Sequence, residues 1–165
     1  ASTTAQQTAK LIQEGHKPCV LVVNKWDQAE DVTTEEYAKY LELRLNHFRS
    51  SPICFTSAIN GRRCWQTIDV ALELYKQSRT QLPTPALNKA LVEAERHHEP
   101  PARKNKKPRL LYGVQVAVGP PTFVVYCRHP DKIDDKYNRY LCRYLGEKFD
   151  LEEVPIRVFF RDAPR

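Results

Sequence analysis

The sequence predicts an α/β fold in two parts: the end of a doubly wound parallel sheet, followed by a small α+β domain. Three observations support this. Helix-like and strand-like segments alternate as α-β-α-β-α through the first half. A proline-rich joint, Gln81 to Pro85, follows. The remaining segments run α-β-β-α-β, an order that places helices on a small sheet.

Length and charge narrow the class of protein. The chain has 165 residues, enough for one ordinary or two small domains, and no Met, even at position 1, so we expect a fragment or an incompletely represented chain. No apolar run approaches about 18 residues, so we expect no membrane segment. Residues 1–85 contain 10 Lys and Arg against 9 Asp and Glu, a net charge of +1; residues 86–165 contain 16 against 11, a net charge of +5. A polyanionic partner is therefore expected for the second half.

The first half begins with a predicted helix from Thr4 to Glu14, with Gly15 as its C-cap. An apolar run rich in β-branched residues, 20–23, is typical of a buried parallel strand. Thr33 and Glu36 form a capping box for a second helix, whose apolar positions Tyr37, Tyr40, Leu41, Leu45 and Phe48 have helical spacing. A strand at 52–56 and a helix at about 65–78 complete this half.

Asn24, Lys25 and Asp27 follow the first strand as Asn-Lys-x-Asp, the pattern with which small G proteins select guanine. The carboxylate of Asp27 can accept from guanine N1–H and the exocyclic amine together, which adenine cannot match. A site that would leave buried polar groups unpaired rejects the wrong base strongly. Asn24 can bridge the base and a neighbouring loop, and the Lys25 stem can lie over the ring. The alternative is an ordinary polar turn after a strand.

Ser57 and Ala58 end the second strand and weaken that alternative. A Ser-Ala pair at this place is what G proteins use to present a backbone N–H to guanine O6. Parallel strands deliver both loops to the same edge of the sheet, where open α/β folds bind ligands. We therefore expect these two residues and the Asn-Lys-x-Asp side chains to form a guanine pocket.

The sequence has no matching phosphate site. It contains no Gly-x-x-x-x-Gly-Lys-Ser/Thr and no Asp-x-x-Gly upstream of Asn24. GTP or GDP is the expected cofactor, with Mg²⁺ only if a phosphate-binding half is supplied. We expect no catalytic residue and no GTP hydrolysis by these residues alone.

The second half begins at the joint. Thr84 and Pro85 predict an N-cap and a first helical residue, for a helix that Pro100 stops. Residues 110–118 alternate as a strand, a Gly-Pro-Pro turn follows, and residues 122–127 form an apolar strand. Asp134 can cap a helix with a clear apolar stripe, and residues 155–160 form a third strand.

A basic segment precedes the first of these strands. Its cations suit contacts with RNA phosphates, and the alternative is a solvated loop; the predicted RNA-binding residues are Arg103, Lys104, Lys106, Lys107 and Arg109.

No metal site is expected. The five cysteines lack a paired spacing, and Cys19, Cys54 and Cys127 lie in or beside apolar runs, where a thiol acts as a small hydrophobe.

The chain resembles the C-terminal part of the Der (EngA) family, GTPases with two consecutive G domains and a KH-like domain. The matching segments span nearly the whole chain, in order: Val22-Val23-Asn24-Lys25-Trp26-Asp27, Ser57-Ala58 with Gly61, Thr84-Pro85-x-Leu87-Asn88, His98-Glu99-Pro100-Pro101, Pro120-Pro121, Tyr137-x-Arg139-Tyr140-Leu141 and Pro155-Ile156-Arg157. The Gly-x-x-Gly loop of ordinary KH domains is absent here, as it is in the family.

The resemblance implies that residues 1–82 are the C-terminal part of a G domain and residues 83–165 a KH-like RNA-binding domain. It implies a GTP-binding factor in assembly of the large ribosomal subunit, with ribosomal RNA and an assembly intermediate as partners. The expected location is the bacterial cytoplasm or an organellar matrix, mitochondrial or chloroplast. The alternative is a catalytically inactive RNA-binding scaffold that retains part of a G fold; an unrelated basic α/β protein is the third possibility.

Overall fold

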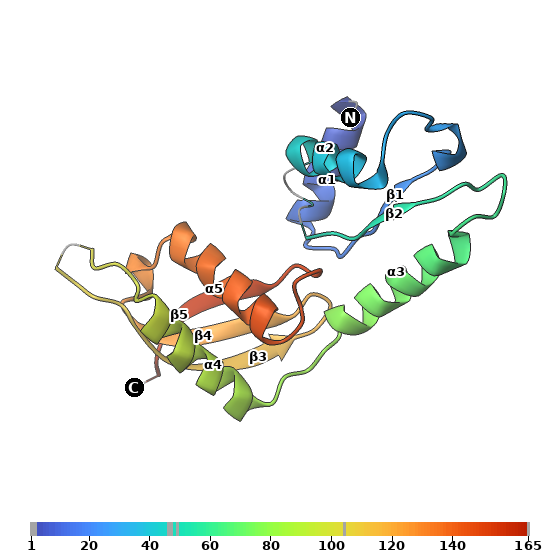
Figure 1. The fold of residues 1–165 in the computed structure, drawn as a ribbon. Helices are drawn as coiled ribbons and strands as arrows, with labels where there is room; N and C mark the ends of the chain where they lie inside the picture. Colours follow the sequence, from blue (N-terminus) through green and yellow to red (C-terminus); the bar gives the residue numbers. More distant parts are fainter. Residues whose placement is uncertain (1–2, 46–47, 49, 104, 165) are drawn as a thin grey trace. The chain divides into compact units, whose positions relative to one another are not determined.

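The computed structural model describes residues 3–45, 48, 50–103 and 105–164. It divides the chain into two compact units, Ala1–Lys76 and Gln77–Arg165. Figure 1 shows the element order, which matches the predicted alternation in both halves.

The first unit contains a two-stranded parallel sheet. Strand β1 (Leu21–Val23) pairs in register with β2 (Ile53–Phe55), and α2 (Thr34–Arg44) connects them. Helix α1 (Thr3–Glu14) precedes β1, and α3 (Cys64–Ser78) follows β2. Phe55 is buried and its ring contacts Tyr37 of α2, with centroids 6.3 Å apart, so α2 packs on one face of the sheet.

The two ends of α2 show how the sequence sets the length of a helix. Thr33 caps α2 as predicted: its hydroxyl accepts from the Glu36 amide and the Glu36 carboxylate accepts from the Thr33 amide. The prediction that α2 continues to Phe48 is wrong, because Leu45 leaves the helical region at φ −119° and ψ 59°. Residues 46, 47 and 49 lie outside the described part of the chain.

Strand β1 is less buried than predicted. Val22 is 51% exposed, although the run Val20 to Val23 is typical of a strand covered on both faces. The reason is the small sheet: in the described part of the chain β1 has one strand neighbour, and Val22 lies on the face opposite Val23 and Phe55.

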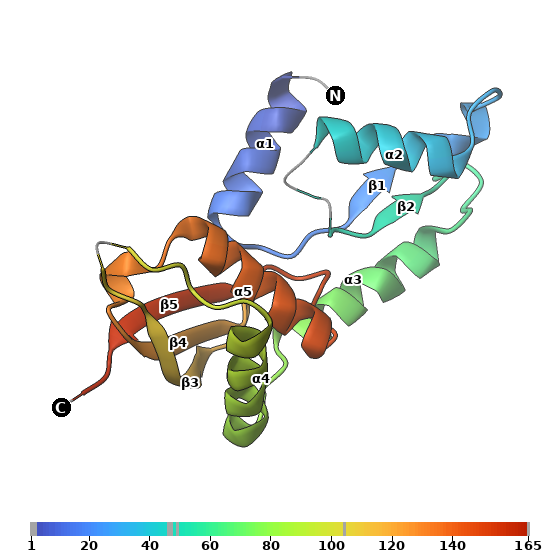
Figure 2. The ribbon, with the colours of Figure 1, turned by 60° about the vertical axis from the view of Figure 1, so that its left-hand side comes forward.

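The second unit places two helices on one face of a three-stranded sheet. Strand β3 (Arg109–Ala117) pairs antiparallel with β4 (Thr122–Arg128), and β4 pairs parallel with β5 (Arg157–Asp162). Helices α4 (Thr84–His97) and α5 (Asp135–Lys148) lie on the same side of this sheet, as Figures 1 and 2 show. Their apolar faces and one face of the sheet enclose the core: Leu87, Ala90, Leu91, Ala94, Leu110, Phe123, Val125, Cys127, Tyr137, Leu141, Leu145 and Val158.

A bulge interrupts the predicted alternation of β3. Leu110 pairs with Cys127 and Tyr112 pairs with Tyr126, so Leu111 is the extra residue between them. The buried side of the strand therefore changes from Leu110 to Gly113. A Cβ at Gly113 would lie 2.6 Å from Leu91 Cδ1, so the absence of a side chain at Gly113 lets Leu91 of α4 pack closely on β3.

The start of α4 differs from the prediction. The N-cap is Pro83, with no side-chain cap bond, and Thr84 is already helical. The helix begins one residue earlier because the Pro83 carbonyl accepts the Leu87 amide at 3.1 Å.

The cysteines are free thiols, and their burial is uneven. Cys127 is fully buried, as predicted, whereas Cys19 and Cys54 are only half-buried. Burial raises the pKa of Cys127 and of Cys142 to about 11, so both thiols are protonated at neutral pH and act as apolar packing groups.

Candidate guanine-recognition corner and basic segment

Parallel pairing brings the two predicted loops together. The Thr56 amide donates to the Val23 carbonyl at 2.9 Å, and the Trp26 amide donates to the Thr56 carbonyl at 3.0 Å. The sheet ladder thus continues past the strand ends into both loops. Asn24 and Ser57 consequently begin from neighbouring points at the carboxyl edge of the sheet.

Asn24 joins the loops through its side chain. Its Oδ1 accepts from the Ala58 amide at 3.0 Å and lies 3.5 Å from Thr56 Oγ1. The side-chain carbonyl of Asn24 is therefore a bridge between the two loops. The Ala58 N–H is already used by Asn24, so a guanine O6 would have to share it.

Asp27 is placed by a short 3-10 turn. Lys25 has left-handed backbone angles, φ 62° and ψ 34°, and the turn η1 (Trp26–Gln28) follows it. The Trp26 ring packs on Phe55, with centroids 4.4 Å apart, and on Tyr37 at 5.5 Å. Lys25 and Asp27 are both exposed. A partly buried indole thus anchors a turn that leaves an ammonium and a carboxylate open to solvent.

The second loop is closed by backbone bonds. The Ser57 and Arg62 amides each donate to the other residue's carbonyl, at 3.1 and 3.0 Å. Gly61 completes the turn at φ +64°, a conformation that glycine adopts without strain. Ser57 is 1% exposed, and its hydroxyl has no hydrogen-bond partner within the described residues. A buried hydroxyl in that state is uncommon and marks a place where a ligand can add a bond.

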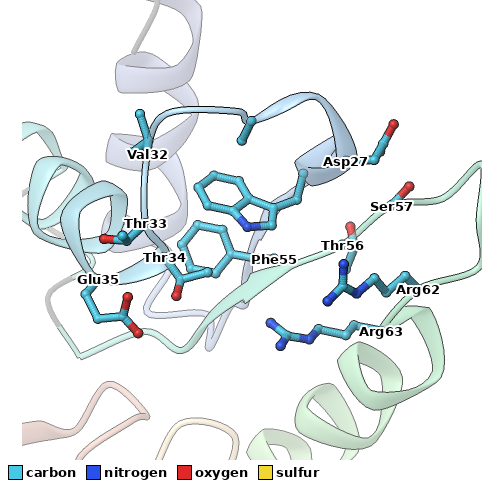
Figure 3. A pocket seen from close by; sticks show the side chains of 12 residues that line it. Asp27, Val32, Thr33, Thr34, Glu35, Phe55, Thr56, Ser57, Arg62 and Arg63 are labelled. Atoms are coloured by element: carbon cyan, nitrogen blue, oxygen red, sulfur yellow. The ribbon is translucent and has the colours of Figure 1, made fainter.

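A cavity of about 480 Å³ opens beside this corner. It shares Asp27 and Ser57 with the predicted site, while Asn24, Lys25 and Ala58 do not line it; the remaining lining residues are Trp26, Ala29, Val32, Thr33, Thr34, Glu35, Phe55, Thr56, Arg62 and Arg63. Figure 3 shows Arg62 and Arg63 on one side of the cavity and Glu35 on the other. Sequence reasoning missed the two arginines, although the basic pair after Gly61 was visible.

The basic segment of the second unit is a tight turn tied to two carboxylates. Arg103 and Lys106 exchange backbone bonds of 2.9 and 3.0 Å. Arg103 Nη2 lies 2.7 Å from Asp134 Oδ2, and Lys107 Nζ lies 2.6 Å from Glu99 Oε2. Lys104 lies outside the described residues. Arg103, Lys106, Lys107 and Arg109 are all exposed. An ion pair between two exposed side chains, such as Lys107 and Glu99, is worth only about 0–1 kcal/mol, so phosphate can compete for that cation.

The described residues offer neither a metal centre nor a membrane span. Among them, no group of three or more His, Cys, Asp or Glu is placed to hold a metal ion. Over the same residues, no helix combines the length and the apolar character that crossing a bilayer requires.

Comparison with known proteins agrees with this architecture. Residues 81–161 match the family described as KH-domain-like of EngA bacterial GTPase enzymes, C-terminal. GTPase Der of Myxococcus xanthus is 40% identical over 158 residues, which are 94% of this chain and 34% of the relative. GTPase Der of Rhodopirellula baltica is 34% identical over 165 residues, which are 99% of this chain and 36% of that relative. The chain belongs to the Der (EngA) family. Its resemblance to the C-terminal part of Der proteins is thereby confirmed.

This chain corresponds to only part of each Der relative. The chain spans about a third of their length: 34% of the Myxococcus protein and 36% of the Rhodopirellula protein. The fold class is the predicted one, a mixed α/β architecture that ends in a KH-like domain. The roles of the guanine corner and the basic segment, and the activity itself, are proposals.

Proposed function

We propose that this chain supplies the guanine-recognition corner and the RNA-binding domain of a GTP-binding factor that assists assembly of the large ribosomal subunit. The observation that carries the proposal is the 3.0 Å bond between Asn24 Oδ1 and the Ala58 amide. It joins the two loops that a G domain uses to read guanine. Membership of the Der family supports the same function.

In this proposal each polar group of the corner has a role. The exposed Asp27 carboxylate accepts from N1–H and the exocyclic amine of guanine. The Lys25 stem covers one face of the base. Ala58 donates to O6 in exchange with Asn24. The Ser57 hydroxyl, which has no partner among the described residues, adds a bond to Asp27 or to the base. Replacing Asp27 by Asn reverses the contact with the exocyclic amine, because an NH2 donor then stands where a carboxylate oxygen accepted.

The expected ligand is GTP or GDP. Residues of this chain bind the guanine base, and a separate phosphate-binding half of the G domain binds the phosphates. The sequence offers no phosphate loop, so Mg²⁺ and catalysis require a phosphate-binding half. We accordingly assign residues 1–82 to a G domain and residues 83–165 to a KH-like RNA-binding domain. The bacterial relatives favour the bacterial cytoplasm, and an organellar matrix is the other compartment that uses such ribosomes.

The proposed RNA contact is made by the basic segment of residues 103–109. Changing Arg103, Lys104, Lys106 and Lys107 to Gln should weaken binding to a large-subunit rRNA hairpin. The slope of log K against log salt should fall by roughly 0.9 for each phosphate that is no longer paired with a cation. Fluorescence anisotropy at several salt concentrations measures both quantities.

A matched variant controls for net charge. Changing Lys10, Lys17, Lys39 and Lys76 of the first unit to Gln removes the same four charges. This control should keep the original salt slope. Equal salt slopes for all three proteins would show that the basic segment is an ordinary solvated loop that makes no phosphate contact.

A scaffold without nucleotide is the second candidate function, and one observation favours it. Helix α3 exposes an apolar stripe at helical spacing, whose members are between 50 and 77% exposed: Trp65, Ile68, Leu72 and Tyr75. Such a stripe marks a surface that packs against further protein. Guanine-nucleotide binding by the native protein separates the two candidates, because the scaffold requires none.

A further inference from the structure

The sheet of the second unit has one face that no helix of this unit covers among the described residues. The core residues Phe123, Val125 and Val158 point to α4 and α5, so their neighbours along each strand point the other way. In the register Tyr112 pairs with Tyr126, which pairs with Arg161. Val114 pairs with Val124, which pairs with Phe159. We call this surface the open sheet face, and its members are Arg109, Tyr112, Val114, Thr122, Val124, Tyr126, Arg128, Arg157, Phe159 and Arg161.

Aromatic rings form the centre of the open sheet face. Tyr112 and Tyr126 stack on each other, with centroids 4.7 Å apart and planes inclined by 23°. Tyr112 and Phe159 remain 37 and 41% exposed, while Val124, which pairs with Phe159, is 9% exposed. The Arg157 guanidinium lies 5.0 Å from the centroid of the Phe159 ring. The open sheet face therefore presents two partly exposed rings, those of Tyr112 and Phe159, and the planar guanidinium of Arg157 beside Phe159.

Charge on the sheet is separated by face. The three strands contain four arginines, Arg109, Arg128, Arg157 and Arg161, and the register places all four on the open sheet face. The only acidic residue in the three strands, Asp162, pairs with Cys127 and belongs to the helix-covered face. The open sheet face therefore carries only positive charge from the three strands. An anionic partner is favoured, and a second apolar protein surface would bury these arginines without counter-charges.

We propose that the open sheet face binds single-stranded RNA, with bases stacked on Tyr112 and Phe159 and phosphates paired with Arg157 and Arg161. Stacked aromatic rings read any base, and arginines beside them follow the backbone. A duplex hides its bases and cannot use the rings. This inference rests on the proposed RNA-binding function and deepens it, because it names a second surface and the kind of RNA.

The test uses the full 165-residue chain and a fluorescein-labelled 12-nucleotide oligouridine, with a 12-base-pair RNA duplex for comparison. Tyr112→Leu and Phe159→Leu remove a ring but keep an apolar side chain on the sheet. Tyr75→Leu, which removes an exposed ring from α3, is the matched control. Circular dichroism establishes that each variant is folded. Cross-linking of the unaltered chain to 4-thiouridine RNA gives a second readout that needs no variant.

Each ring variant should bind the single strand about tenfold more weakly, with an unchanged salt slope, because stacking carries no counterion release. Tyr75→Leu should bind as the unaltered chain does, and cross-links should fall in β3 and β5. Arg157→Gln with Arg161→Gln should lower the slope by roughly 0.7 for each phosphate that these arginines pair with.

Two results would overturn the inference, and they differ in what else they reject. If the chain binds RNA but the ring variants bind equally well, or if duplex is preferred, the open sheet face is not the site and the basic segment alone remains. If the chain binds neither RNA, the proposed RNA-binding function fails as well.

Discussion

Asn88 shows how one side chain can fix the place of a helix on a sheet. Its Oδ1 accepts the Gly113 amide at 2.8 Å, and its Nδ2 donates to the carbonyls of Gly113 at 3.2 Å and Thr84 at 2.9 Å. Gly113 lies on the edge strand β3, so these backbone groups have no strand partner on that side among the described residues. The side-chain amide of Asn88 therefore makes the hydrogen bonds that a neighbouring strand would make with Gly113.

Asn88→Ala should therefore destabilise the second unit by about 1–3 kcal/mol, because it leaves the buried Gly113 amide and carbonyl unpaired. Urea unfolding followed by circular dichroism measures the loss. Lys89→Ala, one residue further along the exposed side of α4, is the control and should change the unfolding free energy by less than about 0.5 kcal/mol. Equal effects from the two substitutions would show that the Asn88–Gly113 pair contributes nothing of its own.

At the scale of elements, α5 depends on an acidic cap shared with the basic segment. The Tyr137 amide donates to Asp134 Oδ1 at 2.8 Å, and the Arg103 guanidinium pairs with Oδ2. The Tyr137 amide and, after it, Arg103 hold the pKa of the Asp134 carboxyl below its usual value of 3.8. The folded chain thus binds this proton less readily than the unfolded chain does.

The sign of the pH dependence follows. Stability from Asp134 is fully present above the unfolded pKa near 3.8 and is lost as the pH falls through the lower folded value. Asp134→Asn keeps a capping oxygen but has no proton to gain, so its stability should fall less steeply between about pH 5 and pH 3, about one unit either side of that value. Urea midpoints across this range measure the difference. Parallel curves for the two proteins would contradict this account of the cap.

At the scale of the whole molecule, periodicity and caps predicted the order of helices and strands in both units. The Thr33–Glu36 box and the Asp134 cap needed no tertiary information, because each is a contact between residues three apart. The proximity of the two loops could be predicted for a similar reason, because loops that follow neighbouring parallel strands lie at the same edge of the sheet. Asn24 and Ala58 are neighbours at this edge.

Features that depend on contacts between distant residues could not be predicted from the sequence. The bulge at Leu111 is a feature of the register between β3 and β4, which the pattern of one strand does not contain. Val22 is half-exposed because of the number of strands beside β1, which local composition cannot report. The pairing of Arg103 with Asp134 joins segments 31 residues apart. The four arginines of the open sheet face could be assigned to one face only once the strands were in register.

The central claim is that Asp27 reads guanine, and the most direct measurement is the relative affinity of the native protein for GDP and xanthosine diphosphate. Equilibrium competition should show a preference for GDP in the unaltered protein. Asp27→Asn should reverse that preference, with a change in the affinity ratio of roughly 100-fold or more. The Asn oxygen can still accept N1–H of either base, but its NH2 group faces the exocyclic amine of guanine, another donor, and can donate to the 2-carbonyl of xanthine. An unchanged preference for GDP in Asp27→Asn would contradict the claim and remove the guanine corner from this account.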